Sequence, residues 1–346
     1  MPTHLVTGGA GFIGSHLVQA LIDRGDDIVV LDNLDGGRAE NVPAGATLVV
    51  GSVADQATAT ELFASYRFTG VYHLAAFAAE GISHAVKHHN YSVNLLGSVN
   101  LINAALVAKA RFFGFASSVA VYGHGHVPMR EQEHAVPADS YGNAKLAVER
   151  ELAVTMKLQG LPYFALRMHN VYGERQNMGD PYRNAVAIFL NQILRGEPIS
   201  VYGDGSQVRA FTYAPDIVGT FLSAADQPDA WGQVFNVGSS QPTTVLEMAH
   251  AVRSAMGVPD HPILHLPSRD EVHTAYTDTG AARRTLGDWN DTPLAEGLRR
   301  TAEWARRHGP VAPSTSLDLE VSDEGRLDWF TWASSRAADS TAPASR

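Results

Sequence analysis

The feature that most constrains the fold is a repeated pairing of a short apolar run with a longer helical stretch. The runs lack the polar–apolar alternation of a half-exposed strand, which is typical of parallel strands covered by helices on both faces. This rhythm predicts a doubly wound α/β fold with a parallel sheet. The predicted strands are His4–Gly8, Asp27–Asp32, Thr47–Ser52, Gly70–Ala76, Arg111–Ser118 and Pro162–Arg167, and the predicted helices are Phe12–Arg24, Gln56–Tyr66, Tyr91–Val107 and Tyr141–Gln159.

After the sixth predicted strand the rhythm ends, and Gly, Pro, Asn and aromatic residues become more frequent. We interpret this change as the start of a smaller α/β lobe that closes over the sheet. The predicted domains are a sheet domain over 1–168, to which parts of 210–240 return, a lobe over 169–308 and a C-terminal tail over 309–346. The tail's Pro, Ser, Ala and Thr content predicts loose order, although Asp328–Trp332 forms an apolar island that is a candidate for docking back.

The composition narrows the class of protein. The formal net charge is −10 and no cluster of Lys and Arg stands out, so we expect neither a nucleic-acid nor an anionic-membrane partner. The chain has no cysteine, which excludes disulfides and thiolate metal ligands, and we expect no metal. The N-terminus lacks the pattern of a signal peptide, and no apolar run reaches the roughly 18 residues of a membrane span. We therefore expect a cytoplasmic protein.

A glycine-rich turn, Thr7–Gly14, follows the first predicted strand and opens the first predicted helix. Gly8 allows a tight turn, Gly11 lets the backbone approach a pyrophosphate, and Gly14 lets the helix pack close to the sheet. The helix N-terminus then offers free N–H groups and partial positive charge to the phosphates. This strand–turn–helix context predicts a dinucleotide site and a Rossmann-type domain.

The second predicted strand ends in Asp32, about twenty residues after the glycine-rich turn. A carboxylate there accepts hydrogen bonds from the adenosine ribose hydroxyls and repels a 2′-phosphate, which favours NAD over NADP. A turn aspartate at a strand end is the alternative interpretation. Arg38 lies nearby and is suited to a 2′-phosphate, so NADP stays open at this point.

The chain holds a single Tyr-x-x-x-Lys, formed by Tyr141 and Lys145. Positions four apart share one face of a helix, so the lysine ammonium can lie near the phenol. A free tyrosine has a pKa of about 10, and a neighbouring cation favours its phenolate form. The pair therefore predicts a general base, with an ordinary helix pair as the alternative.

Two serines, Ser117 and Ser118, end the fifth predicted strand. Ligands of doubly wound folds bind at this carboxyl edge of the sheet, where a hydroxyl can hydrogen-bond a substrate alcohol and the ketone derived from it. Serines that cap a turn or a helix are the alternative.

These motifs together resemble the extended short-chain dehydrogenases, specifically the nucleotide-sugar epimerase/dehydratase group. The resemblance covers roughly residues 3–308 and points to Ser118 as the active hydroxyl, because it stands four positions before the tyrosine of the VYG motif. The motifs that carry it are TGGAGFIG at 7–14, LDNL at 31–34, HLAA at 73–76, SSVAVYG at 117–123, YGNAK at 141–145, LRMHNVYG at 166–173 and VYGDGSQVRAFTYAPD at 201–216.

The resemblance implies a role for each matching position. Ser118, Tyr141 and Lys145 would be catalytic. The NAD contacts would come from Gly8, Gly11, Phe12, Ile13, Asp32, Asn33, Ser52, Val53, Leu74, Ala75, Ala76, Ser117, Tyr141 and Lys145. The substrate contacts would come from Ser118, Tyr141, Asn170, Arg183, Asn184, Tyr202, Arg209 and Arg269, with a core aromatic and a surface ion pair as the alternatives for Tyr202 and Arg209.

Two segments depart from the family pattern. Ser52 stands near the place where the family usually has an acidic residue that touches the adenine, so we expect a weaker contact there. Phe77–Asn90 carries Glu80 and several histidines where the family often has Ser and Pro signatures. The histidines lack a convincing metal spacing and suit a solvated helix face, whereas Glu80 and Ser83 are candidates for touching the sugar.

The expected reaction is NAD-dependent C4 epimerisation of a UDP-hexose through a transient 4-keto sugar. A dehydratase of the group carries an Asp-Glu pair directly after the active hydroxyl residue, and a decarboxylase usually has a glutamate at the second of these positions. Here the two positions are Val119 and Ala120, which cannot act as acid or base.

Several alternatives stay open on the sequence alone. The sugar is glucose/galactose or glucuronate/galacturonate, and an N-acetylated sugar needs room that the sequence does not report. A dehydratase or reductase of the same family and a non-enzymatic NAD-binding regulator are the competing functions. The resemblance also suggests a homodimer that meets through the helices predicted at Tyr91–Val107 and Tyr141–Gln159.

Overall fold

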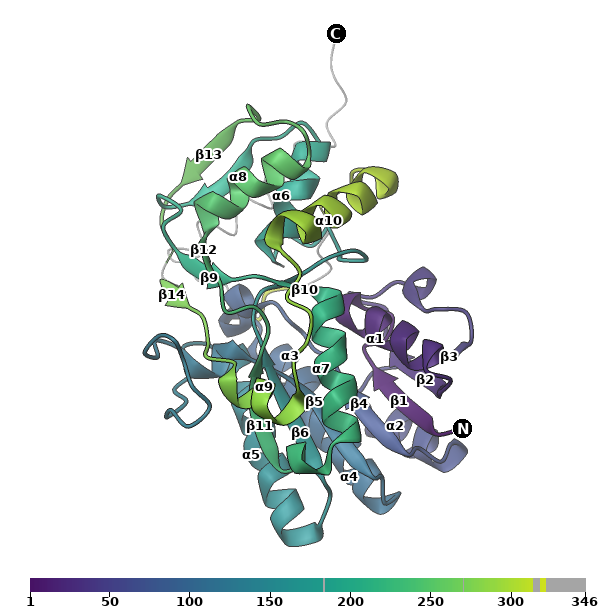
Figure 1. The fold of residues 1–346 in the computed structure, drawn as a ribbon. Helices are drawn as coiled ribbons and strands as arrows, with labels where there is room; N and C mark the ends of the chain where they lie inside the picture. Colours follow the sequence, from purple (N-terminus) through teal and green to yellow (C-terminus); the bar gives the residue numbers. More distant parts are fainter. Residues whose placement is uncertain (183, 270, 314–317, 322–346) are drawn as a thin grey trace.

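Seven parallel strands form the main sheet of the computed structural model, which describes residues 1–182, 184–269, 271–313 and 318–321 (Figure 1). The strand order is β11-β6-β5-β4-β1-β2-β3, so the chain winds outward from β1 in both directions. The predicted doubly wound sheet is therefore confirmed. Its strands are β1 (Thr3–Thr7), β2 (Asp27–Asp32), β3 (Ala46–Val50), β4 (Gly70–His73), β5 (Phe112–Ser118), β6 (Tyr163–Met168) and β11 (Gln233–Val237).

Helices cover both faces of this sheet, as the apolar strands require. On one face, α1, α7 and α9 bury Leu17, Phe221 and Leu286 against the strands. On the other face, α2, α4 and α5 contribute Leu62, Leu101 and others to a second core. The bounds are α1 (Phe12–Asp23), α7 (Ala214–Asp226), α9 (Gly280–Leu286), α2 (Gln56–Ser65), α4 (Gly97–Val107) and α5 (Ser140–Gln159).

The helix predicted over Tyr91–Val107 is interrupted in the structure. It consists of α3 (Lys87–Tyr91), a π-helical turn over Ser92–Leu96 and then α4. Within the π turn, Asn94 accepts a hydrogen bond from the backbone N–H of Phe77 at 2.8 Å and donates one to its carbonyl at 2.9 Å. The turn thereby clamps the loop that follows β4, and π turns of this kind often lie at functional sites.

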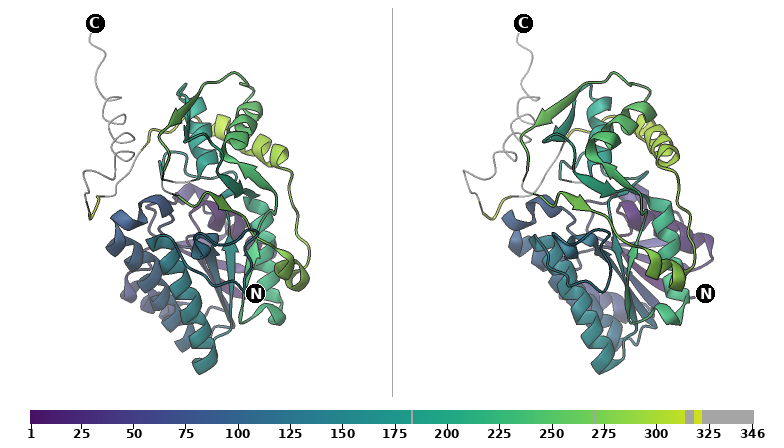
Figure 2. Two further views of the ribbon diagram at one scale, coloured as in Figure 1. Left: turned by 90° about the vertical axis from the view of Figure 1, so that its left-hand side faces the viewer. Right: turned by 60° about the vertical axis from the view of Figure 1, so that its left-hand side comes forward.

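The smaller lobe stands over the carboxyl edge of the sheet (Figures 1 and 2). Its own core joins the helices α6, α8 and α10 to short strand pairs. Its elements are β7 (Val171–Tyr172), α6 (Ala185–Leu194), β8 (Ile199–Tyr202), β9 (Val208–Ala210), β10 (Thr212–Tyr213), β12 (Pro242–Thr244), α8 (Val245–Ala255), β13 (Ile263–Leu266), β14 (Thr274–Ala275) and α10 (Leu294–His308).

The described part of the tail contacts both lobes. Val311 packs in the core of the small lobe and exchanges two hydrogen bonds with Asn191. Farther along, the carboxylate of Glu320 accepts hydrogen bonds from the backbone N–H groups of His88 and His89, each at 2.7 Å. The tail therefore ties the small lobe to the loop between β4 and α4. The island at Asp328–Trp332 lies outside the described residues.

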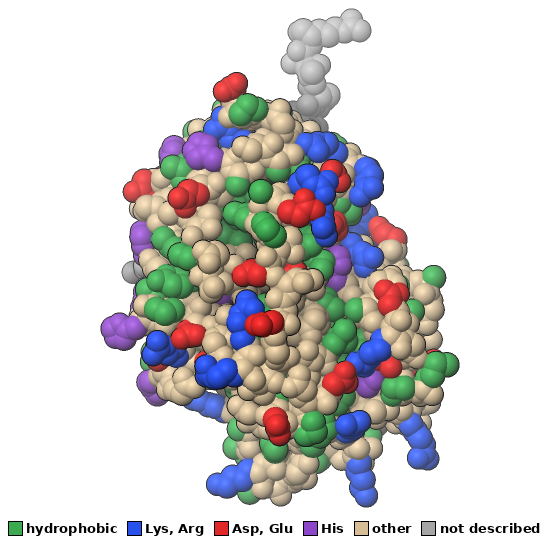
Figure 3. Space-filling view, in the orientation of Figure 1, with side chains coloured by type: hydrophobic (Ala, Val, Ile, Leu, Met, Phe, Trp, Pro, Cys, Tyr) green, Lys and Arg blue, Asp and Glu red, His purple; other side chains and the backbone are tan. Residues whose placement is uncertain are grey.

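Surface charge is mixed rather than segregated. On the face seen in Figure 3, acidic and basic side chains of the described residues are interspersed. Within the described part of the chain, no helix is long and apolar enough to cross a membrane. Nor do the described His, Asp and Glu residues gather into a group of three suited to a metal ion.

Candidate active site

The turn between β1 and α1 is shaped by contacts that only glycine permits. Gly8 has a φ of +73°, and a Cβ there would lie 2.7 Å from the backbone nitrogen of Ala75. A Cβ on Gly14 would lie 2.1 Å from the carbonyl oxygen of Gly8. The first turn of α1, with Phe12 and Ile13, has no side-chain cap, so its N–H groups are left for a ligand. This turn fits the pyrophosphate of a dinucleotide.

Asp32 is placed beside that turn at the end of β2. Its carboxylate accepts hydrogen bonds from the backbone nitrogens of Ala10 at 3.0 Å and Leu34 at 2.9 Å. Burial raises the pKa of Asp32, and these hydrogen bonds oppose the rise. Arg38, the residue that kept NADP open, is ion-paired with Glu40 at 2.6 Å. The local charges therefore suit a ribose diol better than a 2′-phosphate.

The remaining residues predicted at the cofactor lie on neighbouring strand ends. Leu74, Ala75 and Ala76 follow β4, which ends at His73 and not at Ala76, because the chain turns there: the N–H of Ala75 bonds the hydroxyl of Thr7 at 3.2 Å. Ser52 accepts a hydrogen bond from Ala54, Val53 is buried against α4, and the side chain of Asn33 bonds Asp35. No contact in the structure tests their expected role.

Tyr141 and Lys145 lie one turn apart at the start of α5. The helix begins where it does because Asp139 caps it, accepting a hydrogen bond from Gly142 at 2.7 Å. The ammonium of Lys145 lies 5.6 Å from the centre of the Tyr141 ring and donates to the carbonyl of Ala116 at 2.8 Å. Burial lowers the pKa of Lys145 to about 7, with the nearby charge of Glu149 opposing the shift. A lysine of this kind can both hold and release a proton near neutral pH.

The two serines at the end of β5 serve different purposes. Ser118 is partly exposed, and its oxygen accepts a hydrogen bond from the N–H of Ala120 at 3.1 Å, which leaves its proton for donation. Ser117 is buried, and its hydroxyl donates to Glu149, which is ion-paired with Arg167 at 2.7 Å. The side chain of Ser117 therefore belongs to a buried polar network, so any contact with the cofactor would be through its backbone.

Residues predicted at the sugar diphosphate differ in how free their side chains are. Asn170 is partly buried, and its φ of +29° is one that asparagine adopts more readily than most residues. Asn184, by contrast, caps α6 through Val186 at 3.1 Å and donates to the carbonyl of Val171 at 2.7 Å. Both ends of its amide are thus hydrogen-bonded within the small lobe, and a substrate would have to share these groups with the protein. Arg183 lies outside the described residues.

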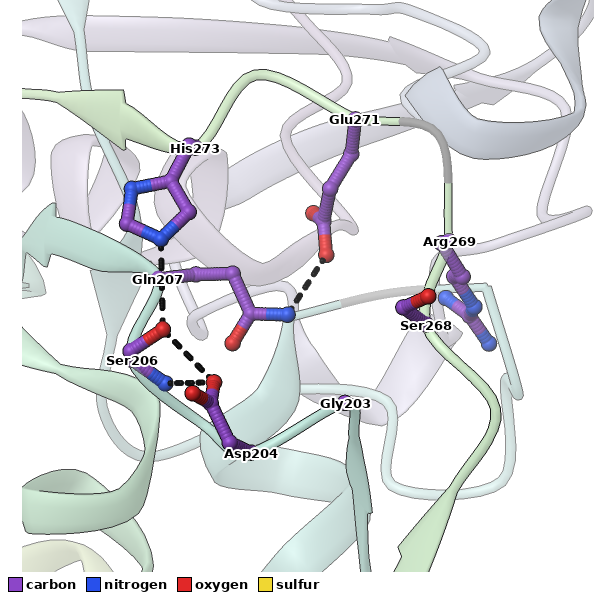
Figure 4. A pocket seen from close by; sticks show the side chains of 8 residues that line it. All are labelled: Gly203, Asp204, Ser206, Gln207, Ser268, Arg269, Glu271 and His273. Carbon is purple, nitrogen blue, oxygen red and sulfur yellow. Dashed lines mark hydrogen bonds between the residues drawn. The ribbon is translucent and has the colours of Figure 1, made fainter.

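The wall formed by the small lobe carries paired charges. Arg209 is ion-paired with Glu271 at 3.0 Å, and the guanidinium carbon of Arg269 lies 3.2 Å from the centre of the Tyr202 ring. Glu271 also accepts a hydrogen bond from Gln207, as Figure 4 shows. Arg269 and Glu271 border a cavity of about 410 Å³. Arg269 therefore contacts Tyr202, whereas Arg209 contacts Glu271, and the substrate contacts expected of these three residues stay a prediction.

Three acidic residues in this region escaped the sequence analysis as site or network members. Glu271 pairs with Arg209, 62 residues away, and Glu149 pairs with Arg167, 18 residues away, so spacing gave no signal for these two. Asp139 stands two residues before Tyr141 with a serine between, which is the pattern of a helix cap, and that signal was available.

Comparison with known proteins places the chain in a family of NAD-dependent enzymes. The model of the NAD dependent epimerase/dehydratase family matches residues 4–238. The chain is 36% identical over 311 residues to UDP-glucose 4-epimerase of Mycolicibacterium smegmatis, covering 87% of this chain and 98% of that protein. It is 30% identical to UDP-N-acetyl-alpha-D-glucosaminuronate decarboxylase of Bacillus cytotoxicus, covering 87% and 97%.

Solved structures agree with these sequence relatives. The crystal structure of UDP-glucose 4-epimerase with UDP-glucose from Thermotoga maritima superposes with a TM-score of 0.84 at 35% identity, covering 88% of this chain and 99% of that one. The relatives thus include both epimerases and a decarboxylase, so similarity alone leaves the reaction and the sugar undecided.

Proposed function

The chain belongs to the NAD-dependent epimerase/dehydratase family, and from that premise we propose that it inverts C4 of a UDP-hexose through a transient 4-keto sugar. The observation that carries the proposal is a set of groups suited to moving the proton of the C4 hydroxyl, next to two side chains that cannot exchange a proton. Ser118, Tyr141 and Lys145 supply the set, and Val119 and Ala120 follow the serine.

The residues present fit NAD. A Cβ on Gly8 or Gly14 would collide with neighbouring backbone, so only glycine allows the close approach of this turn to the chain after β4 and to α1. The first turn of α1 has no side-chain cap, and Asp32 lies beside it. Bound at this site, NAD⁺ would supply the hydride chemistry, as acceptor of the C4 hydride and then as its donor. Because the hydride goes back to the same sugar, no second redox substrate is needed.

Residues of this chain transfer the proton of the 4-hydroxyl. The ammonium of Lys145 favours the phenolate form of Tyr141, and the phenolate oxygen takes the proton of the 4-hydroxyl and becomes a neutral phenol. The hydroxyl of Ser118 donates a hydrogen bond to the sugar oxygen as it becomes a carbonyl. In the second half of the reaction Tyr141 returns the proton to the oxygen, now on the other face of the ring.

Loss of water or of carbon dioxide would need a further acid or base near C5. Val119 and Ala120 stand in the 3₁₀ turn that follows Ser118, with Ala120 buried, and neither carries a group that can exchange a proton. The acid or base that a dehydratase or decarboxylase of the group carries at these two positions is therefore missing, and we expect the 4-keto sugar to turn over and take the hydride on its opposite face. This reasoning favours the epimerase reaction over that of the related decarboxylase.

The experiment that tests the proposal is Tyr141→Phe. The variant keeps the ring and removes the proton acceptor, so turnover of UDP-glucose or UDP-galactose should fall by about 10²–10⁴-fold. Proton NMR of the sugar follows the interconversion, and NAD content shows that the cofactor site is intact. Activity within a few-fold of the parent would remove Tyr141 from the mechanism.

A homodimer is part of the proposal. Large apolar side chains are exposed on the helices predicted to meet: Leu96 is 56% exposed, Val107 84% and Leu158 73%. Burying them against a second copy would remove apolar surface from water. Light scattering at twice the monomer mass is the expected result, and a monomer would refute this part.

A further inference from the structure

Glu80 is connected to the catalytic helix by a short chain of hydrogen bonds. It begins the 3₁₀ turn Glu80–Ala85 in the loop after β4, at the carboxyl edge of the sheet. Its carbonyl accepts a hydrogen bond from the hydroxyl of Ser83 at 2.8 Å. That hydroxyl oxygen in turn accepts one from the backbone N–H of Tyr141 at 3.1 Å. The position of Glu80 is therefore fixed relative to the predicted base.

The carboxyl group of Glu80 lies near charged groups of both lobes. It hydrogen-bonds the carboxyl of Asp139, the residue that caps the helix carrying Tyr141. From the small lobe, Arg209 and Glu271 lie close enough to act on its charge. Glu80 thus stands between the start of α5 and the wall predicted to bind the diphosphate, and its side chain is exposed to water there.

Two carboxyl groups can hydrogen-bond each other only when they share a proton. Desolvation by the surrounding protein atoms and the charge of Asp139 raise the pKa of Glu80 to about 7, while Arg209 opposes the shift and Glu271 adds to it. The pKa of Asp139 is raised as well, mainly by burial, with His84 opposing. This corner of the cleft is rich in hydrogen-bond acceptors and disfavours another negative charge.

A purely structural role does not account for Glu80. Asp139 caps α5 through its own oxygen, and Ser83 reaches Glu80 through the backbone carbonyl, which any residue has. The side chain of Glu80 is therefore dispensable for both connections. An exposed acid held against another acid, next to a catalytic tyrosine, is placed for a ligand.

We infer that Glu80 determines the class of sugar: its carboxyl accepts hydrogen bonds from hydroxyl groups of a neutral hexose and excludes a uronate. The inference rests on the proposed function, since it assumes that the sugar ring lies beside Tyr141. Recognition by an acceptor that the bound sugar covers discriminates strongly, because a substrate that lacks the donor leaves the covered acceptor unpaired. A sugar carboxylate would in addition meet Glu80, Asp139 and Glu271 at once.

Glu80→Gln is the test, because it keeps the shape and removes the charge. In the wild type, UDP-glucuronate should bind at least about tenfold more weakly than UDP-glucose, measured as an inhibition constant on the NAD-loaded protein. In E80Q, kcat/KM for UDP-glucose should fall by about tenfold and the binding of UDP-glucuronate should tighten by a similar factor. Binding of UDP, which lacks the sugar, should not change. Glu61→Gln, at an exposed position on α2, is the matched control.

The outcomes separate this inference from the proposed function. An E80Q variant with an unchanged preference for UDP-glucose over UDP-glucuronate overturns the inference while epimerisation stands. So does a parallel loss of UDP affinity, which would indicate a structural role, or a wild-type enzyme that prefers the uronate. If the wild type epimerises no UDP-sugar at all, the proposed function itself fails.

Discussion

The two walls of the cleft are prepared for their ligands in different ways. The wall on the sheet domain is set by backbone: Gly8 and Gly14 allow contacts that a single methyl group would block, and these contacts are made within the protein itself. The wall on the small lobe is set by side chains that already have partners, as in the ion pair of Arg209 with Glu271. One wall is pre-organised, whereas the other must exchange protein contacts for substrate contacts.

Gly14→Ala tests the pre-organised wall and should have the largest effect. The added Cβ would lie 2.1 Å from the carbonyl oxygen of Gly8, so α1 has to move away from the turn. We expect NAD affinity to fall by about 100-fold or more, equivalent to about 3 kcal/mol. Calorimetric titration with NAD measures the affinity, and circular dichroism checks that the fold is kept.

Gly219→Ala is the matched control, because Gly219 also lies in a helix and a Cβ there would meet nothing within 4 Å. This variant should bind NAD normally and gain up to about 1 kcal/mol of stability, since alanine favours the helix. Equal NAD affinity in the two variants would mean that close packing at the turn is not what prepares this wall.

Arg209→Met tests the exchangeable wall and should have a smaller effect. Loss of a charge-assisted contact to the diphosphate should raise KM for the UDP-sugar by about 10–100-fold and leave kcat within a few-fold. Glu271→Gln should release Arg209 without removing it and so change KM less. Steady-state kinetics on both variants provides the measurement.

Arg195→Met is the control for this second test, because Arg195 forms a comparable pair with Glu197 at 2.9 Å on the same lobe. Its side chain is 21% exposed, against 15% for Arg209, so the two substitutions disturb the surface to a similar degree. Equal changes in KM for R195M and R209M would show that Arg209 has no special relation to the substrate.

The sequence predicts the wall set by backbone better than the wall set by paired side chains. The strands, the helices and the glycine turn depend on residues that are close together in the sequence. Apolar periodicity and spacing therefore suffice to predict them. The pair of Tyr141 and Lys145 is likewise four residues apart, and the structure places both on the first turns of α5.

Contacts between distant segments could not be read from spacing. The hydroxyl of Ser117 is occupied by Glu149, 32 residues away, and the carboxylate of Glu320 caps α3 across 232 residues. The π turn at Ser92–Leu96 also depends on a clamp to Phe77 that no local pattern indicates. The small-lobe wall also depends on contacts between distant segments. The sequence therefore indicated Arg209 and Arg269 but not the residues that they contact.

The central claim is that the hydride removed from C4 returns to the same sugar. UDP-glucose deuterated at C4 and incubated with the NAD-loaded enzyme tests it directly, with proton NMR to locate the label and absorbance at about 340 nm to detect NADH. The account predicts UDP-galactose that keeps deuterium at C4, with no NADH accumulating in proportion to product. Loss of the label to solvent, or one NADH released for each sugar converted, would contradict it.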